Sequence, residues 1–250
     1  MVVRAVGGAL GFLTRLPVGH DETAWEAFRR TPLAFPLAGY LIGGLLALPF
    51  LLPLPDPTLA LVFVAWVYLL TGINHLDGVA DVGDALAVHG DAERRRAVLK
   101  DTTLGVGGIA ATMVIILGVG LAALGLVTAI MEVRYVVGIV VAAEVSAKLA
   151  MATIICGGEA IHDGKGAQFV TESNARSLRL PLLVAAPALL LTVPHFAAAM
   201  SVLGGLAAGV ASWQIAERTL GGVNGDVIGA TNEVARVVAL HLGVIAWMLL

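Results

Sequence analysis

Three aspartates follow an apolar stretch early in the chain, and their spacing suits one face of a helix. They are Asp77, Asp81 and Asp84, so a helical segment would stack their carboxylates along one stripe. The residues between them are small or apolar, whereas a merely solvated acidic face usually mixes in other polar residues. Like charges repel one another, and each is costly near a bilayer, where an aspartate at the centre of a membrane helix costs about 2.5–3.5 kcal/mol. A divalent cation would remove both penalties, so the stripe predicts Mg²⁺ or Mn²⁺ and a phosphorylated substrate.

A basic and glycine-rich segment follows at residues 91–108. It contains a run of three arginines, the pair Lys100 and Asp101, and a helix start rich in glycine. Lysine and arginine neutralise phosphate oxygens, and the N–H groups of a helix start can hold an anion. The arginines are equally explained as charges that orient the chain in a membrane. The position of Lys100 and Asp101 beside the glycines favours a role in the chemistry.

A second polar cluster occupies residues 217–233. Its central sequence is Gly-Gly-x-Asn-Gly-Asp, a composition typical of a turn. A plain loop would need neither both Asn224 and Asp226 nor the preceding Arg218. The segment therefore predicts a loop that binds metal or phosphate.

Two further groups of polar residues are less specific. Glu144 and Lys148 lie one helical turn apart in an apolar stretch, which predicts either a structural ion pair or part of a polar cavity. The connection over residues 157–179 offers additional candidates, whose polarity is ordinary for a loop. These are His162, Asp163, Lys165 and Gln168.

The composition of the chain indicates the kind of structure that must position these groups. Of 250 residues, 58% are hydrophobic and only 13% are charged, against about 25% charged in a soluble domain. Long stretches, such as residues 102–131 and 180–216, carry no Asp, Glu, Lys or Arg. We therefore predict an all-α fold, a polytopic transmembrane helical bundle in which residues 1–250 form one domain. The net charge of −3 excludes a basic nucleic-acid binder, and the one cysteine excludes a disulfide framework.

About seven segments approach the 20 apolar residues that a helix needs to cross a bilayer. Residues 1–14 are apolar but contain Arg4, and they predict an N-terminal interfacial helix. The predicted spans are residues 33–53, 58–74, 104–127, 135–156, 180–198, 199–216 and 235–250.

The distribution of cations predicts how these spans are oriented. With seven spans, 13 of the 15 Lys and Arg residues fall on or just inside one side of the membrane, including Arg236 at the start of the last span. The opposite side receives only Arg134, and Lys148 lies within a span. The positive-inside rule makes the first side cytoplasmic. We therefore expect a multi-pass protein of the cell (cytoplasmic) membrane, embedded in the lipid bilayer, with its active site facing the cytoplasm.

The motifs resemble those of the adenosylcobinamide-GDP ribazoletransferase family, also called cobalamin-5′-phosphate synthases. The resemblance runs in order from about residue 10 to residue 235. It is carried by residues 12–18, 75–84, 100–105 and 218–226. It implies a late step of cobalamin biosynthesis in which adenosylcobinamide-GDP and α-ribazole, or α-ribazole 5′-phosphate, are joined and GMP is released, with Mg²⁺ as cofactor. It is compatible with a homo-oligomer.

The resemblance also implies roles for individual residues. The three stripe aspartates and Asp226 would bind the metal, or one stripe aspartate would receive the proton of the attacking hydroxyl. Phosphate would be held by Lys100 and Arg218. The expected catalytic residues are Asp77, Asp81, Asp84, Lys100 and Asp101. The expected substrate- and cofactor-binding residues are His75, Arg218, Asn224 and Asp226.

Two departures and two alternatives accompany this resemblance. Many members of the family have Ser-Arg where this chain has Thr102 and Thr103, and Gly where it has Ala85. A membrane phosphotransferase of the CDP-alcohol type is one alternative, but its motif has Arg at the position of Asp81. An ion-coupled transporter is the other, but it predicts acids at mid-span in symmetric halves, and only Glu144 lies deep.

Overall fold

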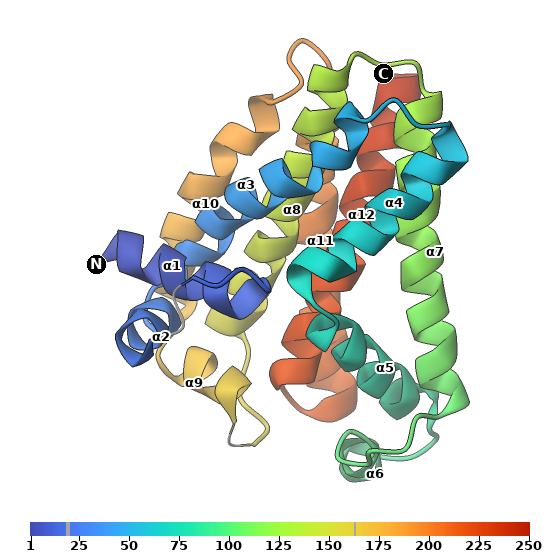
Figure 1. Cartoon of the computed structure of the whole chain (residues 1–250). Coiled ribbons are helices and arrows are strands. Elements are labelled where there is room, and N and C mark those ends of the chain that lie inside the picture. Colours follow the sequence, from blue (N-terminus) through green and yellow to red (C-terminus); the bar gives the residue numbers. More distant parts are fainter. Residues whose placement is uncertain (19–20, 163) are drawn as a thin grey trace.

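The computed structural model describes residues 1–18, 21–162 and 164–250, and these form a helical bundle (Figure 1). The α-helices are α1 (Val2–Leu13), α2 (Glu22–Arg29), α3 (Ala34–Leu46), α4 (Asp56–Thr71), α5 (Asn74–Ala87), α6 (Ala92–Val98), α7 (Val106–Thr128), α8 (Val133–Gly157), α9 (Lys165–Thr171), α10 (Arg179–Ala185), α11 (Ala197–Leu220) and α12 (Gly225–Leu249). Short 3-10 helices are η1 (Leu48–Leu51), η2 (Ala175–Leu178) and η3 (Ala186–Leu190). Within the described residues the β-pairing is limited to an isolated bridge between Ala160 and Val223. The predicted all-α class is confirmed.

The number of long apolar helices is close to the predicted number of spans. Among the described residues, five helices are long and apolar enough to cross a membrane, namely α3 continued by η1, α7, α8, α11 and α12. A sixth is obtained if α4 and α5 are counted together, although they meet at 98°. The remaining predicted span, residues 180–198, contains only the short α10 and η3. Pro187 lies at the start of η3, where its missing N–H and its ring prevent a continuous α-helix.

The bundle has a polar end, which carries α5, α6, α9 and the turn over residues 221–224 (Figure 1). The short loops over residues 52–55, 129–132 and 191–196 lie at the opposite end, with the C-terminus. Successive spanning segments therefore run in alternating directions, with α10 and η3 completing the alternation. This grouping of the connections is the one that the sequence predicts.

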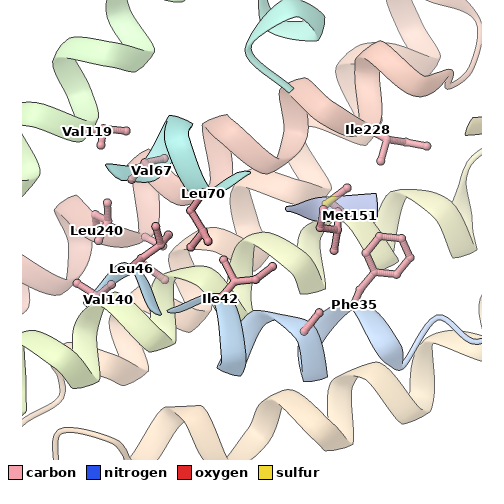
Figure 2. Packing of buried hydrophobic residues seen from close by; sticks show 14 of the residues in the cluster. Phe35, Ile42, Leu46, Val67, Leu70, Val119, Val140, Met151, Ile228 and Leu240 are labelled. Atoms are coloured by element: carbon pink, nitrogen blue, oxygen red, sulfur yellow. The ribbon is translucent and has the colours of Figure 1, made fainter. Parts of the chain in front are cut away.

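The centre of the bundle is α8, which packs against α3, α11 and α12. Almost every residue of α8 from Tyr135 to Cys156 is buried, because small and apolar residues surround the helix on all sides. Figure 2 shows Val140 and Met151 of α8 in this core, to which Ile42 of α3 and Leu70 of α4 also belong. By contrast, α7 leaves a face of large apolar side chains exposed, as expected of a surface covered by lipid.

The last helix begins earlier than the predicted span of residues 235–250. Asn224 caps its N-terminus by accepting a hydrogen bond from the backbone N–H of Val227 at 2.9 Å. The predicted loop is therefore a turn only up to Asn224, and α12 starts at Gly225. Arg236 consequently lies more than two turns into the helix, where it is buried.

A sharp bend separates α4 from α5. Gly72 ends α4 with a φ of +76°, a conformation that glycine adopts without strain. The chain then turns by 98°, so α5 runs across the polar end instead of continuing the span. This bend places the stripe aspartates outside the spanning segments.

Candidate functional site

The contact between α5 and α12 joins the two predicted acidic motifs. A Cβ atom on Gly78 would lie 2.6 Å from the backbone oxygen of Asp226, so only glycine allows the helices to approach this closely. The contact brings Asp226 beside Asp77 and Asp81, which flank Gly78 on α5. The side-chain amide of Asn224 donates a hydrogen bond to the Asp226 carboxylate at 2.7 Å. We call Asp77, Asp81 and Asp226 the acidic face.

The electrostatics of Asp81 reflect this crowding. Burial and then the repulsion of neighbouring carboxylates raise the pKa of Asp81 to about 6. The neighbours are Asp226, Asp77 and Asp84. The charge of Asp81 is thus influenced by carboxylates of both helices, although Asp226 is far from Asp81 in the sequence.

Asp84 has a different environment from the other two stripe aspartates. Its two oxygens accept hydrogen bonds from the backbone N–H groups of Gly105, at 2.7 Å, and Gly108, at 2.8 Å. Gly105 is the N-cap residue of α7, so the Asp84 carboxylate stabilises the start of that helix. Asp84 therefore fixes α7 against α5 on one side of the acidic face.

A cavity of about 400 Å³ lies between α5 and α7. Its lining includes Asp77 and Asp81 together with Thr102 and Thr103. The predicted pair Lys100 and Asp101 immediately precedes these threonines and is exposed. The Asp101 carboxylate accepts a hydrogen bond from the backbone N–H of Thr103 at 3.0 Å, which shapes the turn. Lys100 and Asp101 therefore lie at the edge of the cavity, because the two residues that follow them line it.

The arginine run of residues 94–96 has structural partners. Arg95 donates to the backbone oxygens of Ala85 and Leu86 at the end of α5, at 3.1 and 2.9 Å. Arg96 donates to the backbone oxygen of Leu220 at the end of α11, at 2.9 Å. Positive side chains at helix C-termini are stabilising. The two arginines hold α6 under α5 and α11, while Arg218 lies exposed in the last turn of α11.

The loop before α9 also reaches the acidic face. The Nε2 atom of His162 lies 3.5 Å from the side-chain nitrogen of Asn224. A Cβ atom on Gly166 would lie 2.5 Å from the backbone nitrogen of Gly225, so α9 packs directly on the start of α12. Of the candidates in this connection, the structure thus brings His162 to the site. Asp163 lies outside the described residues.

A network of buried charges extends below the acidic face into the bundle. The predicted pair is present, with Lys148 Nζ 2.8 Å from Glu144 Oε2. Lys148 also donates to Asn232 at 2.7 Å, and Arg236 binds both Glu144 and Glu233. All five side chains are nearly inaccessible to solvent. The sequence predicts only one pair here, and the structure enlarges it to a network between α8 and α12.

His75 belongs to this network rather than to the acidic face. Its Nδ1 atom lies 3.9 Å from Glu233 Oε1, and its Cα is 3.1 Å from the position of a Cβ on Gly229. Burial and the charges of Lys148 and Arg236 lower the pKa of His75 to about 3, so the ring is neutral at pH 7. The side chain therefore connects α5 to the network on α12.

Whether the acidic face can bind a metal cation depends on the arrangement and the chemistry of its donor atoms. Among the described residues, no group of three or more His, Cys, Asp or Glu side chains is already arranged to hold a metal ion. The acidic face nevertheless offers hard oxygen donors whose mutual repulsion a cation would relieve. Mg²⁺ commonly binds through one or two carboxylates, with waters and substrate phosphates completing its coordination. The donor chemistry of the acidic face fits this mode of binding.

A helical membrane protein that gathers carboxylates beside a cavity at one end has the framework of a membrane enzyme. Comparison with known families identifies which one, because the cobalamin-5-phosphate synthase model matches residues 5–244. The chain belongs to this family and is a transferase of cobalamin biosynthesis. The match favours the transferase over the CDP-alcohol and transporter alternatives.

Relatives from halophilic archaea are similar along nearly the whole chain. An adenosylcobinamide-GDP ribazoletransferase of Halorubrum lacusprofundi is 55% identical, covering 99% of each chain. One of Haloquadratum walsbyi is 46% identical over both full lengths. One of Halobacterium salinarum is 48% identical over 78% of this chain and 97% of its own. No solved structure matches the chain.

Proposed function

We propose that this protein joins adenosylcobinamide-GDP to α-ribazole, or to α-ribazole 5′-phosphate, and releases GMP in an Mg²⁺-dependent reaction. The observation that carries the proposal is the contact at Gly78, which brings Asp226 beside Asp77 and Asp81 next to a cavity. The name of the similar proteins of Halorubrum lacusprofundi and Haloquadratum walsbyi, adenosylcobinamide-GDP ribazoletransferase, supports the choice of substrates. The products are adenosylcobalamin, or its 5′-phosphate, and GMP.

The bond changes of this reaction suit the residues present. A ribose hydroxyl oxygen of the acceptor forms a bond to the cobinamide-linked phosphorus, and the bond from that phosphorus to the oxygen of GMP breaks. The proton of the hydroxyl passes to a carboxylate of the acidic face. Lys100 and Arg218 are exposed at the rim of the polar end, and they would bind phosphate oxygens of the substrates.

Mg²⁺ bound by Asp77, Asp81 and Asp226 would supply positive charge to the diphosphate and to the leaving GMP. Asp84 would contribute by holding the start of α7, through its bonds to Gly105 and Gly108. Asp84 would also be a ligand of Mg²⁺.

The polar end is proposed to face the cytoplasm. It carries the connections in which the Lys and Arg residues are concentrated, whereas Arg134 lies at the opposite end. The positive-inside rule supports this orientation in the cell membrane. Donor and acceptor would then both reach the acidic face directly from the cytoplasm.

The proposal is tested by measuring GMP release from purified protein. The protein in detergent is given adenosylcobinamide-GDP, Mg²⁺ and either α-ribazole or α-ribazole 5′-phosphate. We expect GMP to appear in equal amount to the cobalamin product, and only when donor and acceptor are both present. Absence of GMP with either acceptor would refute the proposed reaction.

A further inference from the structure

A second cavity of about 520 Å³ lies at the polar end, enclosed by α1, α2, the start of α5 and α9. It is distinct from the cavity between α5 and α7 and shares none of its lining residues. The residues that matter for its chemistry are Phe12, Asp21, Glu22, Trp25, Asn74 and Lys165. They combine two aromatic rings with several polar and charged groups.

The aromatic rings form a rigid and partly open surface. Phe12 is 38% exposed, and its ring centroid lies 5.2 Å from that of Trp25. Both rings pack on Phe169 of α9, at 5.7 and 5.2 Å, which holds them in place. The indole N–H of Trp25 donates to Gln168 Oε1 at 3.3 Å, fixing the orientation of the ring. A preformed aromatic surface in a cavity suits a flat heteroaromatic ring.

The polar groups around these rings are of two kinds. Asp21 has hydrogen-bond partners within the protein: its Oδ1 accepts hydrogen bonds from the Ala24 backbone N–H and the Thr23 hydroxyl, both at 2.7 Å. Glu22, Asn74 and Lys165 are exposed and point to ligands that carry hydroxyl groups or an anion. Aromatic surface, hydroxyl partners and one cation together match the parts of an aromatic nucleoside or nucleotide.

The position of this cavity relates it to the acidic face. Asn74 lies one helical turn before Asp77 on α5, so the two residues share a face of the helix. The cavity between α5 and α7 is lined by Asp77 itself. In a phosphoryl transfer the attacking and leaving oxygens lie on different sides of the phosphorus, so acceptor and donor need separate positions. The two cavities border neighbouring residues of α5 and provide one position for each substrate.

We propose that the cavity of Phe12, Trp25 and Lys165 binds the acceptor nucleoside, with its base against the two aromatic rings. This assignment rests on the proposed function. Lys165 holds the 5′-phosphate when the acceptor carries one, and Asn74 directs the ribose towards Asp77. The nucleotide end of the donor then occupies the cavity lined by Thr102 and Thr103.

The test compares the Michaelis constants of the two substrates in Phe12→Leu and Lys165→Gln. We expect Phe12→Leu to raise the KM of either acceptor about three- to tenfold, as the loss of one aromatic contact predicts. Lys165→Gln should raise the KM of α-ribazole 5′-phosphate and leave that of α-ribazole unchanged. Neither variant should alter the KM of adenosylcobinamide-GDP. The matched control is Phe196→Leu, which changes an exposed phenylalanine outside both cavities.

Two results would overturn the assignment. One is an unchanged acceptor KM in both variants, and the other is a rise shared equally by donor and acceptor. Lys165 is exposed, so its variant keeps the assignment testable even if Phe12→Leu unfolds. Equilibrium binding of α-ribazole to donor-free protein must weaken in Phe12→Leu in parallel. If the wild-type protein releases no GMP, the proposed function fails. If it releases GMP normally but the acceptor KM is unaltered in both variants, only the assignment of the acceptor to this cavity is refuted.

Discussion

Asp81 and Asp84 lie three residues apart on the same helix, and their carboxylates have different tasks. Asp84 accepts hydrogen bonds from two backbone N–H groups at the start of α7, and these bonds stabilise its negative charge. Burial and then the repulsion of neighbouring carboxylates raise the pKa of Asp81 to about 6. The Asp81 carboxylate has more capacity left for a cation, so we propose it as the main ligand, whereas Asp84 also holds the start of α7.

The raised pKa of Asp81 predicts a pH-dependent stability that Mg²⁺ alters. In metal-free protein the folded state binds a proton at Asp81 more tightly than the unfolded state, whose aspartate has a pKa of 3.8. Asp81 therefore destabilises the fold progressively as the pH rises from 3.8 to about 6, and the penalty persists above that. We expect Mg²⁺ to raise the thermal unfolding midpoint much more at about pH 7.5 than at about pH 5, because only the ionised carboxylate binds it.

The control for this measurement is Asp81→Asn, which removes the titrating group. In this variant the Mg²⁺-induced shift should be small at both pH values. A shift of wild-type size and wild-type pH dependence in Asp81→Asn would contradict the assignment of Asp81 as a ligand.

At the scale of helices, the site depends on how closely α5 approaches α12. An added methyl group at Gly78 would meet the Asp226 backbone oxygen at 2.6 Å, so Gly78→Ala must push the helices apart. A displacement of about 1 Å in a reacting geometry costs about 100-fold in rate. We expect GMP release by Gly78→Ala to fall by about this factor while the protein remains folded in detergent.

Gly44→Ala is the matched control, because an added Cβ on Gly44 of α3 would meet no atom within 4 Å. Its rate should equal that of the wild-type protein. Full activity in Gly78→Ala would show that the close approach of the two helices is unnecessary for catalysis.

The buried charges between α8 and α12 support the site from below. Replacing Arg236 with Met removes the cation that Glu144 and Glu233 share; Glu144 keeps Lys148, whereas the buried Glu233 carboxylate loses its ion pair with Arg236. Breaking such a network costs about 3–5 kcal/mol of unfolding free energy. We expect Arg236→Met to lower the thermal unfolding midpoint strongly. Arg134→Gln, which breaks the exposed pair with Glu132, should change stability by about 0–1 kcal/mol. Equal small effects of the two substitutions would contradict a stabilising role for the network.

At the scale of the whole molecule, the orientation of the polar end can be measured directly. In a Cys156→Ala background, single cysteines replace Glu93 of α6 or Glu132 before α8, both exposed residues at opposite ends. A membrane-impermeant maleimide should label Glu132→Cys in intact cells and Glu93→Cys only after permeabilisation. The reverse pattern would place the acidic face outside the cytoplasm.

The features that follow from local spacing could be predicted from the sequence. The helical stripe of Asp77 and Asp81, the apolar spans and the pair of Glu144 and Lys148 depend on residues within two turns of one another. Isolated charges in apolar surroundings are costly, so these patterns stand out in a chain with few charges.

The remaining features depend on contacts between distant segments. His162 meets Asn224 across 62 positions and Glu144 meets Arg236 across 92, separations at which a single sequence carries no pairing signal. Helix α12 begins ten residues before the predicted span of residues 235–250, because Asn224 caps it and the network pairs the charges of Glu233 and Arg236. The structural role of Asp84 likewise depends on where α7 begins.

The Mg²⁺ dependence of GMP release tests most directly whether the carboxylates of α5 and α12 form one site. Rates are measured at increasing Mg²⁺ concentration for wild-type protein, Asp81→Asn and Asp226→Asn, with Asp56→Asn at the opposite end of the bundle as control. We predict that both site variants lose about 100-fold or more in rate and need more Mg²⁺, since metal stabilisation of phosphate charge is worth several kcal/mol. Asp56→Asn should match the wild type. GMP release that persists in a chelator, or wild-type rates in both site variants, would contradict the shared metal site.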